Sequence, residues 1–131
     1  MSDKAVLVTG AAGLIGSAVV KRLLRDGRSV IACDDLAAGG WKAERPDLVS
    51  IDQDVSSPDF IEKLNRYSIG GVVHCAAHPG GRSLQEPSLD VKVNAYASMA
   101  LFEWCARNKV YVIYPSSSVV YGDQPRGDIP E

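Results

Sequence analysis

The stretch Thr9-Gly10-Ala11-Ala12-Gly13-Leu14-Ile15-Gly16 carries three glycines in a G-x-x-G-x-x-G spacing. It follows the short apolar run Ala5-Val6-Leu7-Val8 and opens a segment, 14–25, in which apolar residues recur at helical spacing. A strand that turns through glycines into a helix is typical of the first unit of a parallel α/β sheet. Gly10 can turn sharply off the strand, and Gly16 lets the helix pack closely on the sheet.

The same turn predicts an anion-binding site. The helix N-terminus offers unpaired N–H groups and the positive end of the helix dipole, and Gly13 lets a pyrophosphate approach the backbone. Ala12, Leu14 and Ile15 are expected to belong to this binding edge. We therefore expect a dinucleotide at this turn, and the alternative is a tight strand–helix turn without a ligand.

An acidic residue agrees with the dinucleotide interpretation. Asp34 lies 18 residues after Gly16, at the end of the apolar run 30–33. A carboxylate at this place can accept hydrogen bonds from both hydroxyls of an adenosine ribose, and it would repel a 2′-phosphate. The expected cofactor is therefore NAD and not NADP. Asp35 is the alternative acceptor, and an ordinary turn acid is the alternative to both.

The rest of the chain alternates between strands and helices. Strands are predicted at residues 5–8, 30–33, 48–51, 72–76 and 110–115. Helices are predicted at residues 14–25, 58–67 and 87–108. Leu14 and Ile15 are expected on the buried face of the first helix, and Tyr96 on the inner side of the third. Ser56 or Ser57 is expected to cap the second helix. Continuous apolar runs between helices indicate a parallel sheet that is covered on both faces. The predicted fold is a Rossmann-type, doubly wound α/β sheet of about five strands in the order 3-2-1-4-5.

Size, charge and cysteine content exclude several classes of protein. The 131 residues are enough for one domain, and the net charge of -2 gives no basic footprint for nucleic acid. No apolar run reaches the length of a signal peptide core or a membrane span, so we expect a cytoplasmic protein without membrane contact. The three cysteines are odd in number and form no C-x-x-C pair, so neither a metal site nor a disulfide framework is expected.

Further segments carry a resemblance to a known family. They are Asp34-Asp35-Leu36, Asp52-Gln53-Asp54-Val55, His74-Cys75-Ala76-Ala77 and Ser116-Ser117-Ser118-Val119-Val120-Tyr121-Gly122. In this order and spacing, together with the glycine turn, they resemble the NAD-dependent epimerase/dehydratase family of extended short-chain dehydrogenase/reductases. Among its members, the UDP-glucose (UDP-galactose) 4-epimerases are the most similar, and the resemblance covers nearly the whole chain.

The resemblance implies NAD as cofactor and assigns further contacts to it. Asp54 would face the adenine amino group and Val55 would line the ring pocket. The backbone of Cys75, Ala76 and Ala77 would line the nicotinamide side, and Asn94 would lie near the active site. The loop that begins at His78 and runs to Arg82 would either contact the sugar or diphosphate or serve only as a connection.

The resemblance also implies a chemistry and one catalytic residue. In this family a tyrosinate removes a proton from a sugar hydroxyl while hydride passes to NAD, and a serine or threonine hydroxyl relays the proton. Ser117 falls on that hydroxyl, with Ser118 as the alternative. The Ser-Ser-Ser segment favours a 4-epimerase, because dehydratases tend to carry Thr-Asp-Glu there. The substrate would be a nucleotide-sugar.

The family's Tyr-x-x-x-Lys motif does not occur in these 131 residues, since none of the five tyrosines has a lysine four positions later. We therefore expect residues 1–131 to be the N-terminal, NAD-binding part of a longer enzyme, without the substrate domain and inactive alone. Its last strand would then expose an edge or an apolar face, and the helix 87–108 could pair two copies as a homodimer. The alternatives are a non-catalytic NAD-binding regulatory or scaffold module, and another nucleotide-sugar dehydratase or reductase of the family.

Overall fold

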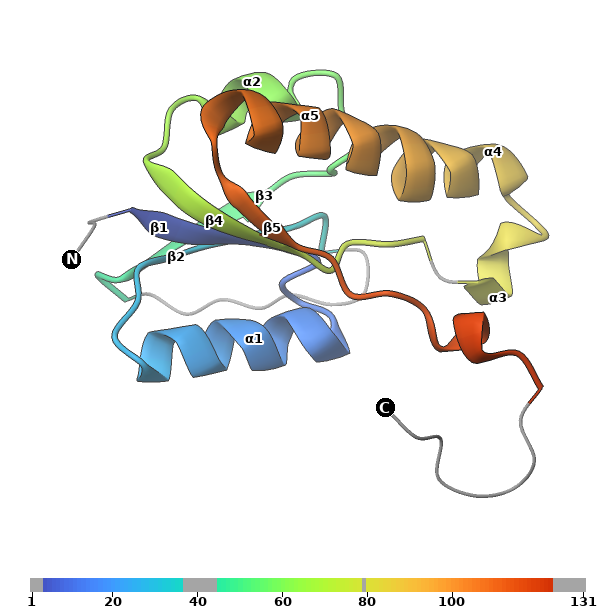
Figure 1. The fold of residues 1–131 in the computed structure, drawn as a ribbon, viewed down its shortest axis with the longest axis horizontal. Coiled ribbons are helices and arrows are strands. Elements are labelled where there is room, and N and C mark those ends of the chain that lie inside the picture. Colours follow the sequence, from blue (N-terminus) through green and yellow to red (C-terminus); the bar gives the residue numbers. More distant parts are fainter. Residues whose placement is uncertain (1–3, 37–44, 79, 124–131) are drawn as a thin grey trace.

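A parallel sheet forms the centre of the molecule, with helices on both of its faces (Figure 1). This computed structural model describes residues 4–36, 45–78 and 80–123. The five strands are β1 (Ala5–Thr9), β2 (Val30–Asp34), β3 (Leu48–Asp52), β4 (Ile69–His74) and β5 (Tyr111–Ile113). Hydrogen-bonded neighbours follow the order β3-β2-β1-β4-β5, which confirms the predicted doubly wound topology.

The helical segments are α1 (Leu14–Arg25), α2 (Phe60–Leu64), α3 (Gly80–Ser83), α4 (Pro87–Asp90), the π-helix η1 (Val91–Ala97), α5 (Ser98–Asn108) and the 3-10 helix η2 (Ser118–Tyr121). Helices α4, η1 and α5 are consecutive, so the predicted helix over 87–108 is confirmed, with a π-helical middle. Helix α2 is shorter than predicted. It begins after Asp59, and neither Ser56 nor Ser57 is its cap. The short helix α3 lies where only a loop was expected.

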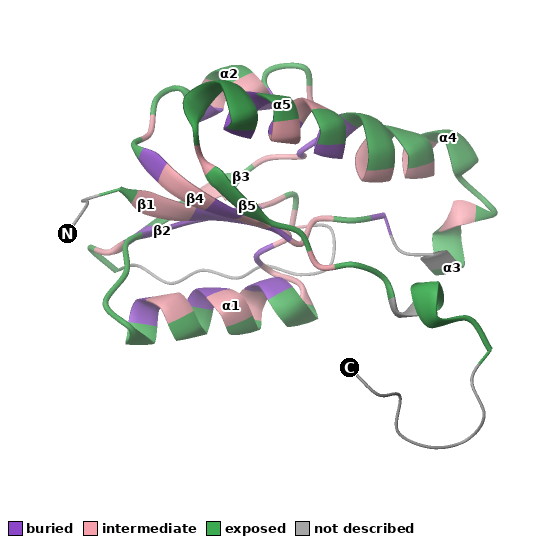
Figure 2. Cartoon of the chain, viewed as in Figure 1, coloured by how far each residue is buried: buried purple, intermediate pink, exposed green. Residues whose placement is uncertain are grey.

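Side chains alternate between two cores along the strands, as the pleat of a sheet requires. On one face, Leu7 packs with residues of α2 and α5, including Phe60 and Leu101. On the other face, Val8 packs with residues of α1, including Val20 and Leu24. Figure 2 shows this buried layer between the sheet and each set of helices. Strands β1, β2 and β4 are therefore packed on both faces, and this packing positions the carboxyl ends of these strands.

The first turn of α1 differs from the prediction. Leu14 and Ile15 were expected on the buried face, but they are 91% and 57% exposed. The buried positions are Gly16, Val20 and Leu24, at spacings of four residues. The two large apolar side chains at the start of the helix therefore extend past the edge of the sheet and do not pack on it.

Strand β5 forms one edge of the sheet and carries exposed apolar side chains. Tyr111 and Ile113 are 85% and 65% exposed. They point to the same face of the sheet as the side chain of Val73, because Val73 and Ile113 are register partners. Helix α1 packs against residues of β1, β2 and β4 on this face, but the structure describes no helix over β5. The expected open apolar face is thus present in the described part of the chain.

Candidate cofactor-binding cleft

The glycine turn is packed so tightly that side chains are excluded at two of its positions. Gly10 has φ +63, and a Cβ atom there would lie 2.7 Å from the backbone N of Ala76. A Cβ atom on Gly16 would lie 2.0 Å from the carbonyl oxygen of Gly10. Both distances are far below van der Waals contact. The turn after β1, the start of α1 and the end of β4 therefore form one close-packed unit.

The N-terminus of α1 presents backbone donors. Gly13 is the N-cap, and no described side chain caps this end of the helix. The first helical backbone bond runs from the N–H of Ser17 to the carbonyl of Gly13. The preceding N–H groups have no intrahelical acceptor, and they lie at the positive end of the helix dipole. This arrangement can hold a phosphate.

Asp34 is fixed beside the glycine turn. Its Oδ2 accepts a hydrogen bond of 2.9 Å from the backbone N–H of Ala12, and its Oδ1 accepts one of 2.8 Å from the N–H of Leu36. Each carboxylate oxygen can accept a further hydrogen bond. The carboxylate is thus oriented, and it keeps acceptor capacity for the vicinal hydroxyls of a ribose.

A second carboxylate, that of Asp54, adds negative charge to the part of the cleft that contains Asp34. The side chain of Asp54 accepts hydrogen bonds from the backbone N–H and the hydroxyl of Ser56, at 2.7 and 2.9 Å. Burial, and then the charges of neighbouring aspartates including Asp34 and Asp54, raise the pKa of the Cys33 thiol to about 12. A negative field of this kind would oppose a further phosphate group placed beside Asp34.

A cleft of about 510 Å³ connects these features, within the usual size range of small-molecule sites. It is lined by most of the residues that the sequence predicts as cofactor contacts: Gly10, Gly13, Asp34, Asp35, Asp54, Val55, Cys75, Ala76 and Ala77. The remaining lining residues are Gln53, His78, Arg82, Glu86, Leu89 and Val93. Among the described side chains, no group of three or more His, Cys, Asp or Glu residues could hold a metal ion.

Several predicted contacts lie outside this lining. The N–H of Ala12 is used by Asp34, Gly16 lies under the turn, and Leu14 and Ile15 are exposed on the first turn of α1. Ser117 is exposed, and its hydroxyl accepts a hydrogen bond of 3.3 Å from the N–H of Val119. Ser118 is the first residue of η2. The catalytic role of Ser117 or Ser118 stays a prediction.

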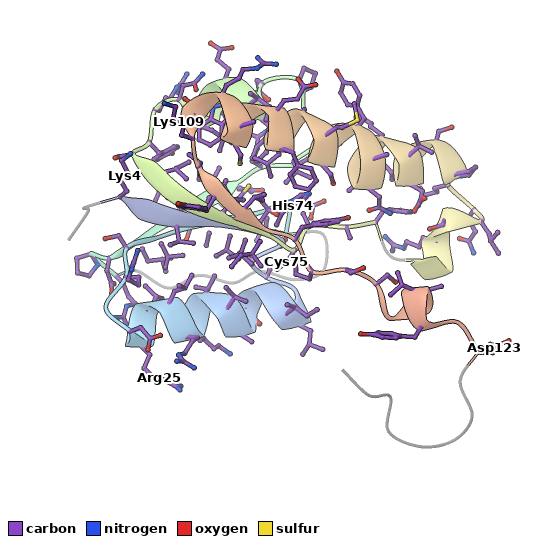
Figure 3. All side chains as sticks on the ribbon, viewed as in Figure 1. Lys4, Arg25, His74, Cys75, Lys109 and Asp123 are labelled. Carbon is purple, nitrogen blue, oxygen red and sulfur yellow. The ribbon has the colours of Figure 1, made fainter. Side chains whose placement is uncertain are left out.

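His74 has a structural place at the end of β4, as Figure 3 shows. It is 1% exposed. Its Nδ1 lies 2.6 Å from the Thr9 hydroxyl and its Nε2 lies 2.9 Å from the Ser98 hydroxyl. The Thr9 hydroxyl also accepts a hydrogen bond from the N–H of Ala76. Burial lowers the pKa of His74 to about 4, so the ring is neutral and links β1, β4 and α5 below the cleft.

Asn94 holds the chain that follows β4. Its Oδ1 accepts a hydrogen bond of 2.7 Å from the N–H of His78, and its Nδ2 donates one of 3.2 Å to the carbonyl of His78. Its Nδ2 also donates to Asp90. Asn94 is therefore placed to position His78, and its direct contact with a cofactor stays a prediction.

Glu86, Leu89 and Val93 were missed by the sequence reasoning. Glu86 precedes Leu89 by three residues, and Leu89 precedes Val93 by four. In a helix that starts at Pro87, Leu89 and Val93 therefore lie on one side, and Glu86 is the residue just before the helix. This helical spacing, close to the loop from His78 to Arg82, could have predicted that the three residues form a wall of the cleft.

The fold defines a Rossmann-type α/β protein, with its cleft outside the carboxyl ends of the strands, where such sheets bind ligands. Residues 6–131 match the NAD dependent epimerase/dehydratase family, and the chain belongs to this family.

Individual relatives agree with this assignment. The chain is 35% identical over 127 residues to a UDP-glucose 4-epimerase of Mycolicibacterium smegmatis, a match that covers 91% of this chain and 41% of that protein. It is 36% identical over 121 residues to an ADP-L-glycero-D-manno-heptose-6-epimerase of Alkalilimnicola ehrlichii, covering 89% of this chain and 38% of that protein. A solved structure of Thermus thermophilus UDP-glucose 4-epimerase in complex with NAD superposes with a TM-score of 0.83 at 31% identity, covering 97% of this chain and 42% of that one.

The chain thus spans about two fifths of the length of these relatives. Within the described ranges 4–36, 45–78 and 80–123, no helix has the length and apolar character needed to span a membrane.

Proposed function

We propose that this chain is the NAD-binding portion of a nucleotide-sugar epimerase, with a reaction most similar to UDP-sugar 4-epimerisation. The cofactor assignment rests on one observation. The glycine turn, the carboxylates of Asp34 and Asp54, and the segment after β4 border a single cleft. The chemistry that NAD supplies when bound is reversible acceptance of hydride from a sugar carbon.

The residues of the cleft fit the parts of NAD. The backbone of Gly10 and Gly13, with the N-terminus of α1, would hold the pyrophosphate. Asp34 would accept hydrogen bonds from the adenosine ribose, for which its two oxygens keep acceptor capacity. Asp54 and Val55 would border the adenine, and the backbone of residues 75–77 would border the nicotinamide end.

The substrate assignment rests on the relatives and on the serine segment. UDP-glucose 4-epimerases are among the relatives at 30–35% identity, and a heptose epimerase acting on an ADP-linked sugar matches to the same extent. Ser117 is our proposed proton-relaying hydroxyl, with Ser118 as the alternative. A nucleotide-sugar is the substrate class common to these relatives, and the 4-epimerisation is the more specific proposal.

Calorimetric titration of NAD into the wild type and Asp34→Asn tests the cofactor assignment. We expect the variant to bind NAD about tenfold more weakly, because a charged acceptor of ribose hydroxyls is lost. Its preference for NAD over NADP should also shrink, since a repelling charge is removed. Asp26→Asn, at the far end of α1, is the matched control and should bind like the wild type.

A purely structural effect of Asp34→Asn would weaken NAD and NADP binding equally. Equal NAD affinities of the wild type, Asp34→Asn and Asp26→Asn would refute the assignment of Asp34 to the ribose.

A further inference from the structure

A network of side chains ties the end of β3 to helix α2, beside the cleft. Gln53, which lines the cleft, donates from Nε2 to the Ser57 hydroxyl at 2.7 Å and to the Asp59 carboxylate at 3.2 Å. Lys63 donates to Oε1 of Gln53, and its Nζ lies 2.8 Å from Oδ2 of Asp59. The amide of Gln53 is therefore held at both its nitrogen and its oxygen.

The chemistry of the partners fixes which way the Gln53 amide faces. The Lys63 ammonium only donates, so it must face the amide oxygen, and the Asp59 carboxylate only accepts, so it must face the nitrogen. The hydrogen bond from Lys63 also lowers the pKa of the Asp59 carboxyl, so this group is ionised at neutral pH. Both N–H donors of the amide are used within the network. Gln53 therefore supports the wall of the cleft and has no N–H left to offer a ligand.

The network continues to Asp54 through Ser57. The Ser57 hydroxyl accepts from Gln53 and donates to the carbonyl of Asp54 at 2.6 Å, and the Ser57 N–H donates to the same carbonyl at 3.0 Å. These bonds close the turn 54–57. Within this turn, the N–H and the hydroxyl of Ser56 hold the two oxygens of the Asp54 carboxylate. The orientation of Asp54, which lines the cleft, thus depends on a turn that the network holds.

We propose that Lys63 is a positioning residue that sets the base selectivity of the cleft, through Gln53 and the turn 54–57. Lys63 does not line the cleft, so its effect must pass through Gln53. This inference rests on the proposed function, which places the adenine of NAD beside Asp54. The amino group of adenine donates hydrogen bonds, and each Asp54 oxygen can accept one more. Hypoxanthine carries a carbonyl oxygen in place of this amino group, and the carboxylate would repel it.

Calorimetric titration with NAD and with nicotinamide hypoxanthine dinucleotide measures this selectivity, because the two probes differ only in the base. Lys63→Met removes the ammonium, whereas Lys63→Arg keeps a cation that can donate to both Gln53 and Asp59. Gln53→Ala removes the link itself. Arg66→Met is the matched control, because it removes an exposed cation that follows α2 and does not line the cleft. Lys63 and Gln53 are only partly buried, so the variants should fold, and thermal melts check this.

We expect the wild type to bind NAD about tenfold more tightly than the hypoxanthine analogue, which corresponds to one hydrogen bond to a charged group. Lys63→Met and Gln53→Ala should each reduce this ratio about threefold, because a less constrained carboxylate aligns poorly with the amino group. Lys63→Arg should restore most of the ratio, and Arg66→Met should leave it at the wild-type value. The double variant should lose no more than Gln53→Ala alone, because Lys63 acts through Gln53.

An unchanged ratio in Lys63→Met, or a loss that Arg66→Met reproduces, would overturn the role of Lys63. A ratio reduced in Gln53→Ala but not in Lys63→Met would mean that Gln53 acts on the base without Lys63. Weakening of both dinucleotides by the same factor would indicate a general loosening of the fold and would also contradict the proposal. So would a wild type that binds both dinucleotides equally.

The proposed function fails separately from this inference. If the wild type binds NAD and Asp34→Asn weakens that binding, each contradicting result above leaves the proposed function standing and removes only the role of Lys63. If NAD does not bind at all, the proposed function itself fails, and the inference fails with it.

Discussion

The backbone N–H of Ala12 donates a hydrogen bond of 2.9 Å to the carboxylate of Asp34. This contact joins the glycine turn after β1 to the end of β2, across 22 residues of sequence. The predicted pyrophosphate donors and the predicted ribose acceptor are therefore held together before any ligand arrives. Such preorganisation lowers the entropic cost of binding.

The contact between Gly16 and Gly10 predicts a specific effect of mutation. Gly16→Ala should lower the free energy of unfolding by about 2 kcal/mol, because its Cβ would lie 2.0 Å from the Gly10 carbonyl oxygen. It should also weaken NAD binding, since the turn must shift to admit the methyl group. Urea denaturation and calorimetry measure the two effects.

Gly81→Ala provides the comparison for this substitution. A Cβ atom on Gly81 would meet nothing within 4 Å, so stability should hardly change. If Gly16→Ala were as stable as Gly81→Ala, the close packing of α1 on the turn would be wrong.

The buried His74 predicts a dependence of stability on pH. Burial lowers its pKa from 6.5 to about 4 in the folded state, so the unfolded chain binds more protons in this window. The free energy of unfolding should therefore fall as the pH falls from about 6.5 towards about 4. Between about pH 7 and about pH 5 the contribution of His74 is about 2 kcal/mol.

His74→Gln removes the titrating group and keeps a side chain that can hydrogen-bond. Denaturation curves of wild type and variant at both pH values isolate the contribution of His74, because the carboxylates titrate alike in both. The wild type should lose about 2 kcal/mol more than the variant on acidification. Parallel losses would show that His74 is not held neutral.

The exposed face of β5 predicts self-association. Tyr111 and Ile113 are exposed on an edge strand, and such strands pair with other chains. The apparent mass by light scattering should rise with concentration, and Ile113→Lys should suppress the rise. Met99→Lys tests the alternative homodimer through the helix 87–108, on which Met99 is also exposed. Suppression by Met99→Lys alone would favour the helix.

The absent Tyr-x-x-x-Lys motif predicts that this 131-residue chain does not convert UDP-galactose to UDP-glucose. None of the five tyrosines has a lysine four positions later, so the tyrosine–lysine pair of the family motif is missing from these 131 residues. Chromatography of the nucleotide-sugars after incubation with NAD measures the conversion. Turnover above a protein-free blank would mean that another group acts as the base.

The fold followed from local patterns that are strong in this sequence. Helix α1 begins at Leu14 and ends at Arg25 as predicted, because glycines bound it on both sides, with Gly27 in the left-handed region at φ +70. The strand order followed from the alternation of strands and helices. Most of the lining of the cleft also followed, since its motifs lie at the ends of strands.

The errors have physical causes. Leu14 and Ile15 fit the apolar period of α1, but periodicity does not reveal where the sheet ends beneath a helix. Tyr96 was expected on the inner side of the long helix and is 68% exposed. It lies in the π-helical segment η1, whose wider turn shifts the phase that a regular α-helix would have. The pairing of Asn94 with His78 depends on the path of the loop between them, which the sequence pattern does not encode.

A thermal melt with added dinucleotide tests most directly the claim that the glycine turn and Asp34 form an NAD site. NAD at about 100 times its dissociation constant should stabilise the chain by about 2.7 kcal/mol and raise the Tm, while NADP at the same concentration should leave the Tm unchanged. A cooperative melt that neither dinucleotide shifts, or one that NADP shifts as much as NAD, would contradict the claim.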